Sequence, residues 1–297
     1  MAGVAARRRA RRMSALDGTE PVPIGFAIVG VQKAATSTLY RMLTKHPRIV
    51  GGPEKELRYF LEKRDWSDPD YSAYCRPRLP AKADVAGDAT PAYLFWPHAL
   101  ERMRDYRSDM RLMATFRDPV ERAFSQWAME RSRHEDYPDL PEAMARYGAD
   151  ALPEQLPEDR PGPSLQRSLF ARGRYGAQVE RGLSIFPREQ WLFLEFRELL
   201  STPERALDRA TDHLGLPRFG RYPGLIHRNA TPTRNAGPAP TVTEFDRLVR
   251  GYADDLALFE RLTDVDTSGW PTRQVLSGDL AVEELHARLC GKLGLAS

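Results

Sequence analysis

A single lysine lies among small and hydroxyl-bearing residues near the start of the chain, in the sequence GVQKAATST over residues 30–38. Gly30 permits a tight turn, and Lys33 adds a full positive charge. If a helix begins here, its unpaired N–H groups and its dipole converge on the loop, and together they bind anions. The remaining residues are small or carry a hydroxyl, so backbone N–H groups and hydroxyls can face a ligand: Ala34, Ala35, Thr36, Ser37 and Thr38.

The loop differs from the Walker A motif, which is G-x-x-x-x-G-K-[ST]. Counted from Gly30, the Gly-Lys pair of that motif would fall at Ala35 and Thr36, so Lys33 stands too early. Taken alone, the loop therefore fits either a phosphate site or an ordinary strand-to-helix turn with a solvated lysine.

A second candidate anion site begins at Arg117, after the apolar run of residues 112–116. The sequence DPVE at 118–121 predicts a helix start, with aspartate as N-cap, proline at N1 and glutamate at N3. Ser125 would lie on the same side of this helix as Asp118. Arginine suits a phosphate because its fork can bond two oxygens at once. The alternative is that Arg117 pairs with Asp118 or another acid.

Two carboxylates flank a lysine in the sequence EKE at 54–56, just after a glycine-rich turn. This segment is either a charged helix start or the position of a general base, whose pKa nearby cations would tune. Asp88 and Thr90 lie at the end of a further expected strand, and Pro91 fits the first position of a following helix. Loops after strand C-termini are where α/β sheets bind ligands.

Short apolar runs and helical periods predict the scaffold that must position these residues. Buried strands are expected at 26–29, 49–50, 112–116 and 191–196, the last as a central strand. Helices are expected at 39–43, 203–214 and 245–262, and a helical pattern interrupted by Gly173 covers 169–183. Together they predict an α/β fold, a single domain over residues 21–297 with a central, mostly parallel sheet flanked by helices.

The overall charge excludes a strongly basic body made for nucleic acid. The net charge of the 297 residues is +3, and five arginines lie in the first twelve residues. Subtracting these five from the 44 lysines and arginines leaves 39 basic against 41 acidic side chains, a net charge of −2. Residues 1–20 are expected to form a disordered basic tail, or an anionic-surface contact.

Other features of the sequence limit the possible cellular compartment, membrane association and metal binding. Cys75 and Cys290 are far apart in sequence, which favours reduced thiols in a cytoplasmic protein. No stretch approaches the length of a membrane span, and the basic N-terminus lacks the apolar core of a secretory signal, so no stable membrane insertion is expected. No cluster of histidine and cysteine ligands is visible, so no metal is expected.

Two polar segments interrupt the pattern. Residues 133–166 are rich in proline and acids, and we expect them to form a lid or an acceptor-side insertion, because so long an irregular segment inside a domain is usually functional or mobile. Residues 227–238 form a polar loop that contains Arg228 and Arg234 but no core residues.

Together, the motifs resemble the sulfotransferases that use 3′-phosphoadenosine-5′-phosphosulfate (PAPS), with the closest likeness to the heparan-sulfate-type branch and its bacterial relatives. The resemblance covers about residues 24–270 and depends on the order and spacing of the motifs. They are GVQKAATST at 30–38, KELRYF at 55–60, TPAY at 90–93, FRDPVERAFS at 116–125, GRY at 173–175 through FP at 186–187, and a final pattern from Tyr252 to Trp270.

The resemblance implies a P-loop-like sulfotransferase fold and a role for each matching residue. Lys33 would contact the bridging oxygen and neutralise the leaving phosphate, and Glu56 would be the general base, with Glu54, Asp88 and His98 as alternatives. The remaining matches imply binding of the cosubstrate. Ala34, Ala35, Thr36, Ser37 and Thr38 would surround the 5′-phosphate, Arg117 and Ser125 the 3′-phosphate, and Tyr175, Arg228 and Arg234 would complete the site.

Three features differ from the family pattern. Ala34-Ala35 replaces the frequent Gly-Gly or Thr-Gly after the lysine, and the small size is kept. Asp88-Ala89 stands where animal enzymes have Glu-Lys, so a lysine near the acceptor or sulfate is absent. The disulfide-closed late loop of those enzymes is also absent, and Arg228 and Arg234 are expected to cover the 3′-phosphate instead.

The activity implied is in-line transfer of the sulfuryl group of PAPS to a hydroxyl of a small-molecule or carbohydrate acceptor, without a metal. The nearly neutral charge disfavours a highly sulfated polyanion as acceptor, and no pattern indicates an oligomeric state. One alternative is a P-loop-like kinase or NTPase, against which the early lysine and the lack of a clear Walker B acid argue. The other is a non-enzymatic nucleotide-binding protein.

Overall fold

The computed structural model describes residues 22–52, 54–76, 83–148, 161–224 and 237–296. The expected tail over residues 1–20 and the two loop residues Arg228 and Arg234 lie outside these ranges. The chain forms two compact units. The first contains the residues up to Phe116 together with Arg181–Arg228, and the second contains Arg117–Glu180 together with Asn229–Ser297.

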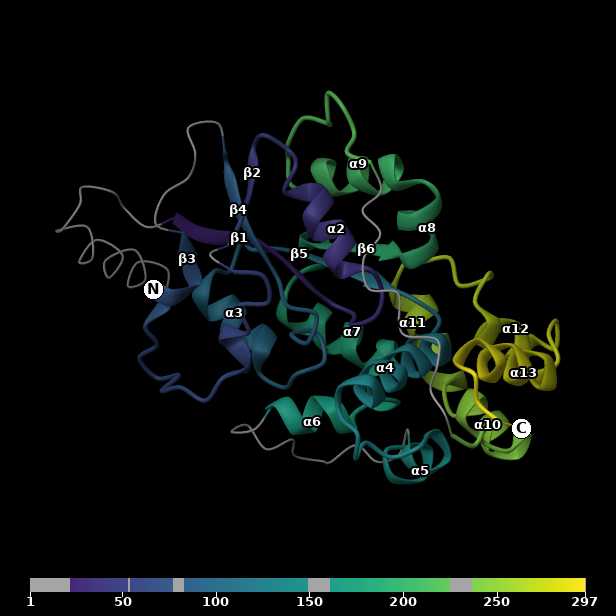
Figure 1. The fold of residues 1–297 in the computed structure, drawn as a ribbon. Coiled ribbons are helices and arrows are strands. Elements are labelled where there is room, and N and C mark those ends of the chain that lie inside the picture. The colour runs from purple at the N-terminus through teal and green to yellow at the C-terminus, as the bar shows by residue number, and fades with distance from the viewer. Residues whose placement is uncertain (1–21, 53, 77–82, 149–160, 225–236, 297) are drawn as a thin grey trace. The chain divides into compact units, whose positions relative to one another are not determined.

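The first unit is built on a mostly parallel sheet with β1 (Val22–Gly30) at its centre (Figure 1). β1 pairs in parallel with β4 (Val85–Ala89) and β5 (Arg111–Phe116). β2 (Ile49–Gly51) pairs with β4, and β6 (Trp191–Glu195) pairs with β5, which gives the order β2-β4-β1-β5-β6. A short strand, β3 (Cys75–Arg76), is antiparallel to the start of β1. The predicted mostly parallel sheet is therefore confirmed.

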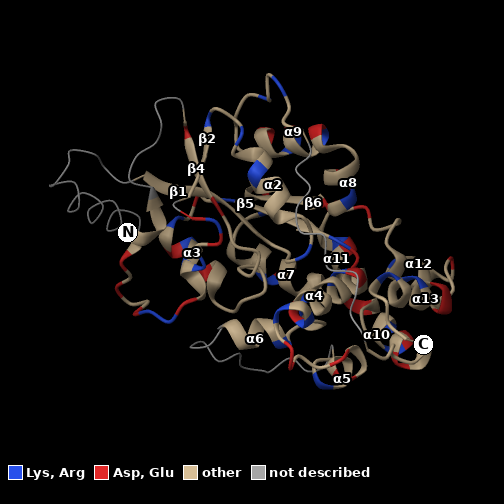
Figure 2. Ribbon diagram, viewed as in Figure 1, with Lys and Arg blue, Asp and Glu red and all other residues tan. Residues whose placement is uncertain are grey.

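Helices α2 (Thr36–Leu43) and α9 (Pro203–His213) share a core with this sheet. Leu39 of α2 and Leu207 of α9 are fully buried together with Phe26 and Ile28 of β1. Both helices follow the predicted apolar period, and α9 is followed by Gly215 in the left-handed conformation (φ 67°). Acidic and basic side chains are interspersed on α9 (Figure 2). The first unit also contains α3 (Ala99–Tyr106), α8 (Phe196–Ser201) and the short 3-10 helices η1 (Tyr59–Leu61), η2 (Tyr71–Tyr74) and η4 (Arg188–Gln190).

The described part of the second unit is helical. Phe124 and Trp127 of α4 (Pro119–Arg133) are buried against Phe245 of α10 (Val242–Arg250) and Leu289 of α13 (Val282–Leu293). The unit also contains η3 (Ala171–Gly173), α11 (Ala253–Leu262) and α12 (Pro271–Ser277), and α7 (Tyr175–Ile185) begins in it. Helix α5 (Leu140–Arg146) lies within the segment 133–166, and α6 (Pro161–Arg167) begins in it; the lid function of this segment stays a prediction.

The expected helix with Pro91 at its first position does not form. The chain makes turns instead, and α3 begins only at Ala99. The N–H of Leu94 donates to the carbonyl oxygen of Val29 in β1 (2.9 Å), and a helix starting at Pro91 would need that N–H for Thr90. The long-range bond to the sheet therefore overrides the local preference.

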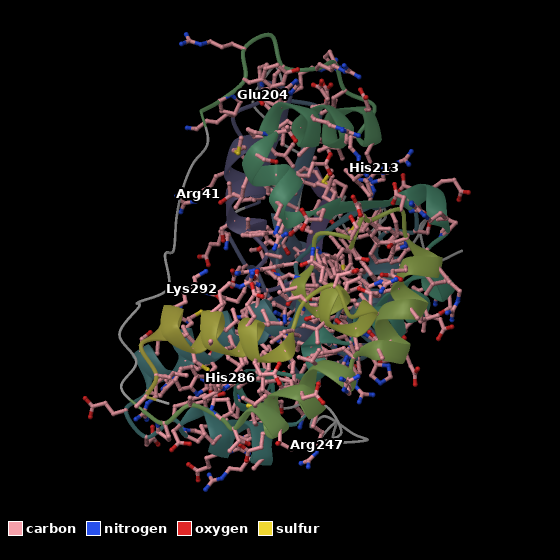
Figure 3. All side chains as sticks on the ribbon, turned by 90° about the vertical axis from the view of Figure 1, so that its right-hand side faces the viewer. Arg41, Glu204, His213, Arg247, His286 and Lys292 are labelled. Atoms are coloured by element: carbon pink, nitrogen blue, oxygen red, sulfur yellow. The ribbon has the colours of Figure 1, made fainter. Side chains whose placement is uncertain are left out.

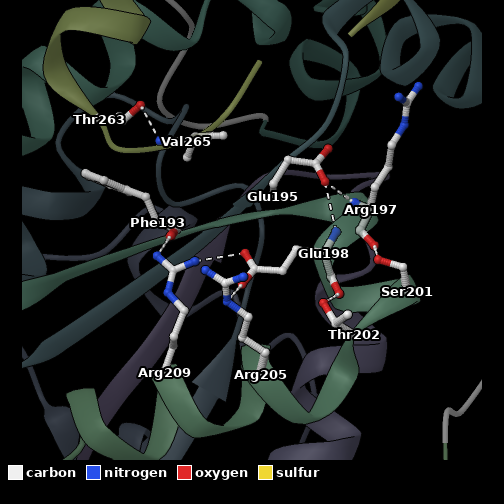
Figure 4. A network of polar contacts seen from close by, with 10 residues as sticks. All are labelled: Phe193, Glu195, Arg197, Glu198, Ser201, Thr202, Arg205, Arg209, Thr263 and Val265. Carbon is white, nitrogen blue, oxygen red and sulfur yellow. Dashed lines mark hydrogen bonds and ion pairs between the residues drawn. The ribbon is translucent and has the colours of Figure 1, made fainter. Parts of the chain in front are cut away.

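β6 is an edge strand of the described sheet, so its predicted central position is wrong. Its residues are nevertheless buried along most of their length, because α8 and α9 pack against it. Arg209 of α9 donates to the carbonyl oxygen of Phe193 (2.9 Å) and to Glu198 of α8 (2.8 Å), and Glu195 caps α8 by accepting the N–H of Glu198 (2.9 Å) (Figure 4). A continuous apolar run indicates that both faces of a strand are buried. It does not show whether the strand lies at the edge or at the centre of the sheet.

Candidate functional site

The lysine loop joins the carboxyl end of β1 to the start of α2. Lys33 (φ 71°) and Ala35 (φ 59°) both take the left-handed conformation, and Ala35 stands at the N-cap, where it provides no side-chain cap. Gly30, at the start of the loop, packs against Leu94, since a Cβ at this glycine would lie 2.9 Å from Leu94 Cδ2. The first N–H groups of α2 thus belong to a tight loop that carries one lysine, as an anion site requires.

Thr115 of β5 holds this loop through two hydrogen bonds. Its hydroxyl donates to the carbonyl oxygen of Ala34 (2.6 Å), and its own carbonyl oxygen accepts the N–H of Val31 (2.9 Å). Thr115 and Ala34 are fully buried. Two hydrogen bonds to Thr115 therefore hold the loop at Val31 and at Ala34. They help to keep Lys33 and Ala35 in the left-handed conformation, which is unfavourable for residues other than glycine.

Glu56 lies in a second loop of the same unit, which follows β2. Its side chain is 46% exposed, and one carboxylate oxygen is 2.7 Å from Lys55 Nζ. Glu56 (φ 59°) and Arg58 (φ 54°) are both left-handed, so this loop also has an unfavourable backbone conformation. The expected charged helix start is not observed, since η1 begins only at Tyr59.

The two loops emerge at the same edge of the sheet. β2, β4 and β1 are parallel neighbours, so their carboxyl ends lie side by side. The N–H of Gly52 donates to the carbonyl oxygen of Gly87 in β4 (2.6 Å) and extends the β2–β4 pairing toward the Glu56 loop. The structure therefore places Lys33 and Glu56 in loops at the carboxyl ends of neighbouring parallel strands, where α/β sheets commonly bind ligands.

The other candidate bases differ sharply in exposure. Asp88, at the carboxyl end of β4, is fully buried and accepts hydrogen bonds from Tyr74 (3.2 Å) and from the N–H of Ala89 (2.6 Å). Burial raises the pKa of the Asp88 carboxyl, and these hydrogen bonds oppose that rise. Glu54 and His98 are exposed. A buried carboxylate that is already bonded on both oxygens is poorly placed to take a proton from an acceptor.

Arg117 and Ser125 belong to the second unit. Arg117 directly follows β5, and its Nη2 and Nε both lie 3.2 Å from Glu121 Oε2, with the Arg117 side chain 14% exposed. The predicted alternative of an acid partner is thus observed, with Glu121 as that partner. Ser125 lies two turns further along α4 and is partly exposed.

Asp118 and Tyr175 make buried hydrogen bonds next to Arg117. Asp118 is the N-cap of α4, as predicted, because its carboxylate accepts the N–H of Glu121 (2.9 Å). The same carboxylate accepts the N–H and the hydroxyl of Thr272 (2.7 and 3.0 Å), a contact that no sequence signal indicated. Tyr175 is buried, and its hydroxyl donates to the carbonyl oxygen of Arg117 (2.9 Å). Burial raises the pKa values of both side chains.

Two further polar residues of the second unit lie within the sequence motifs, but their contacts were not predicted. Asp255 accepts the N–H groups of Gly176 (2.9 Å) and Ala177 (3.0 Å) and so caps the start of α7. Arg122 is fully buried and donates to Gln126 (2.7 Å) and to the carbonyl oxygen of Leu169. The only available signal was the i, i+4 spacing of Arg122 and Gln126 on the predicted helix.

The described ranges contain neither a candidate metal site nor a candidate membrane span. Within those ranges, no three His, Cys, Asp or Glu side chains gather in a way that could hold a metal ion. None of the helices described there combines the length and the apolarity that crossing a membrane requires.

A lysine loop between the central parallel strand and a helix defines a P-loop-like α/β protein. Comparison with known proteins narrows this class. Heparan sulfate glucosamine 3-O-sulfotransferase 3B1 of Mus musculus is 31% identical over 196 residues, which are 65% of this chain and 46% of that protein. Heparan sulfate glucosamine 3-O-sulfotransferase 3A1 of Homo sapiens is 29% identical over 207 residues, which are 68% of this chain and 47% of that protein.

A solved structure shows the same likeness over nearly the whole fold. The sulfotransferase from Alicyclobacillus acidocaldarius is 26% identical with a TM-score of 0.63, and the match covers 84% of this chain and 99% of that one. No family model matches the chain. The chain spans about half the length of the curated relatives that it matches. The chain is similar to heparan-sulfate sulfotransferases in sequence and to a bacterial sulfotransferase in structure, and the predicted fold is confirmed.

Proposed function

We propose that the protein transfers the sulfuryl group of PAPS to a hydroxyl of a carbohydrate or small-molecule acceptor. The observation that supports this most is the pairing of two loops at one sheet edge, one with Lys33 and one with Glu56. The first is suited to bind an anionic leaving group, and the second offers an exposed carboxylate. The similarity to sulfotransferases supports the choice of PAPS over other nucleotides.

Lys33 and the start of α2 would act on the 5′ end of the cosubstrate. When the S–O bond breaks, negative charge grows on the 5′-phosphate oxygen that leaves. A cation and N–H groups already held at that position stabilise the transition state more than the ground state. Ala34, Ala35, Thr36, Ser37 and Thr38 would bind the same phosphate through N–H groups and hydroxyls.

Arg117 and Ser125 would bind the 3′-phosphate. The ion pair with Glu121 keeps the Arg117 guanidinium extended along α4, and a phosphate would share or displace this carboxylate. Tyr175 holds the backbone of Arg117, and its direct contact with the cosubstrate stays a prediction, as do the contacts of Arg228 and Arg234.

Glu56 would take the proton of the acceptor hydroxyl as its oxygen attacks sulfur. One O–S bond forms, the S–O bond to the 5′-phosphate breaks, and the proton passes to the carboxylate. The exposure of Glu56 leaves it open to an acceptor, whereas the alternative base Asp88 is buried. A sugar hydroxyl is the favoured acceptor, because the similar proteins are named as heparan sulfate glucosamine sulfotransferases.

The test separates binding from chemistry. We expect calorimetry to show binding of 3′-phosphoadenosine-5′-phosphate by the unmodified protein, and PAPS to give transfer onto at least one member of a hydroxyl acceptor panel. Glu56→Gln should keep this binding and lose turnover by about 10²- to 10⁴-fold. Glu62→Gln, a nearby exposed glutamate paired with Arg64, is the matched control. No nucleotide binding and no transfer by the unmodified protein would refute the proposal.

A further inference from the structure

The Glu56 loop has a backbone conformation that its own residues do not favour. Two non-glycine residues within three positions, Glu56 and Arg58, have positive φ. In this region the Cβ of an L-residue crowds the backbone, and such strain persists only where surrounding contacts enforce it. The contacts that enforce it are therefore as relevant to catalysis as the glutamate itself.

Two buried side chains of the β4 end supply these contacts. The N–H of Arg58 donates to Thr90 Oγ1 (3.3 Å), and the N–H of Leu57 approaches Asp88 Oδ1 (3.5 Å). These are long hydrogen bonds, so neither alone would hold the loop. Together they fix the two peptide units that follow Glu56, and these units set the direction of its side chain.

Asp88 and Thr90 act as one group. The Thr90 hydroxyl donates to Asp88 Oδ2 (3.1 Å) while its oxygen accepts the Arg58 N–H. Tyr74 donates to the same carboxylate oxygen (3.2 Å), and all three side chains are at most 1% exposed. An ionised carboxylate accepts from every one of these donors, since it has lone pairs on both oxygens and no proton of its own.

The sheet fixes Asp88 in turn. It pairs with Ala27 of the central strand β1, and a Cβ at the preceding Gly87 would lie 2.0 Å from Phe26 Cζ. The backbone of β4 is thus pressed against β1, where no larger residue would fit. Because Asp88 is held by the sheet, its hydrogen bonds also hold the exposed Glu56 loop at a fixed position relative to the sheet.

We propose that Asp88, through Thr90, is a positioning residue that holds the Glu56 loop in its catalytic conformation. The inference rests on the proposed function, in which Glu56 is the base. Asp88 touches no reacting atom. Its role is to accept the hydrogen bonds that keep Glu56 and Arg58 in the left-handed region.

The experiment compares turnover with nucleotide binding in variants at Thr90 and Asp88. Thr90→Val keeps the shape but loses the acceptor for Arg58, so kcat should fall by about 10- to 100-fold, the cost of a small misplacement of a catalytic group. Thr90→Ser restores the hydroxyl and should recover most of this loss. Asp88→Asn should lower kcat at least as much. Affinity for 3′-phosphoadenosine-5′-phosphate should stay within about threefold in all three variants.

The matched control is Thr211→Val, because Thr211 is also fully buried but its hydroxyl bonds only to carbonyl oxygens of α9. It should keep kcat. If Thr90→Val keeps kcat, or if nucleotide affinity falls in parallel with kcat, the inference is wrong. The comparison of Thr90→Val with Thr90→Ser tests the inference even if Asp88→Asn does not fold. Failure of the proposed function is recognised separately, since the unmodified protein would then show no transfer.

Discussion

Removing the Thr115 hydroxyl should loosen the lysine loop without touching any group that binds the nucleotide. Thr115→Val keeps the shape of the side chain. It deletes the hydrogen bond to the carbonyl oxygen of Ala34 (2.6 Å), while the backbone bond from Val31 remains. Ala34 is fully buried, so its carbonyl oxygen gains no water in exchange.

The size of the effect follows from two contributions. A buried acceptor left without its partner costs about 1–3 kcal/mol of folding stability. In addition, the left-handed residues Lys33 and Ala35 each cost about 1–2 kcal/mol, and this strain drives the released loop toward another conformation. A nucleotide must then reorder the loop, and about 1–2 kcal/mol of lost affinity corresponds to a Kd higher by about 5- to 30-fold.

Urea unfolding and calorimetry with 3′-phosphoadenosine-5′-phosphate measure the two quantities on the same sample. Thr211→Val is again the matched control: it deletes the same atoms from another fully buried threonine, whose hydrogen bonds lie within α9. Both variants should lose stability, and only Thr115→Val should lose affinity. Equal affinities in the two variants would show that Thr115 supports the fold but does not hold the loop.

Three further predictions concern other parts of the chain. Burial lowers the pKa of His213, at the end of α9 (Figure 3), to about 4, below its usual 6.5. The unfolded state therefore binds more protons between these values, and about 3 kcal/mol of stability should be lost as pH falls from 6.5 to 4. Urea titrations should show this loss reduced in His213→Gln, and equal pH slopes would contradict it. Arg209→Leu should cost about 1–3 kcal/mol, because it removes the hydrogen-bond donor to Oε2 of the largely buried Glu198 and to the Phe193 carbonyl oxygen. The exposed Arg205→Leu should cost under about 0.5 kcal/mol in the same assay, and equal losses would refute the distinction. Tyr175→Phe removes the bond to the Arg117 carbonyl and should weaken nucleotide binding by about fivefold, or about 1 kcal/mol. Unchanged affinity would exclude a supporting role for Tyr175.

Local signals predicted much of the fold. The N-cap at Asp118 and the extent of α9 depend on local residues, and both were predicted from the sequence. The strands at the sheet centre were recognisable because burial on both faces requires continuous apolar runs. The same runs could not show that β6 lies at an edge, since helices cover it as completely as a central strand.

The supports of the candidate site depend on contacts between distant residues. Thr115 is 81 residues from Ala34, and Thr272 is 154 residues from Asp118. In the sequence each is a single threonine in an unremarkable position. Only the pairing of β5 with β1, and the packing within the second unit, bring their hydroxyls to a partner. The motifs therefore stood out in the sequence, whereas the supporting roles of Thr115 and Thr272 did not.

The distribution of backbone strain links these supports to the proposed chemistry. Among the described residues, five non-glycine residues have positive φ, and four of them lie in the Lys33 and Glu56 loops. Strain of this kind survives where surrounding contacts enforce it, and it is concentrated at functional sites. Each loop is held by a buried polar group of an adjacent strand end, Thr115 for one and Asp88 with Thr90 for the other. Two loops strained independently, and anchored to the same sheet, can keep a cation and a carboxylate at fixed positions before any substrate arrives. This preorganisation is what stabilisation of a charged transition state requires.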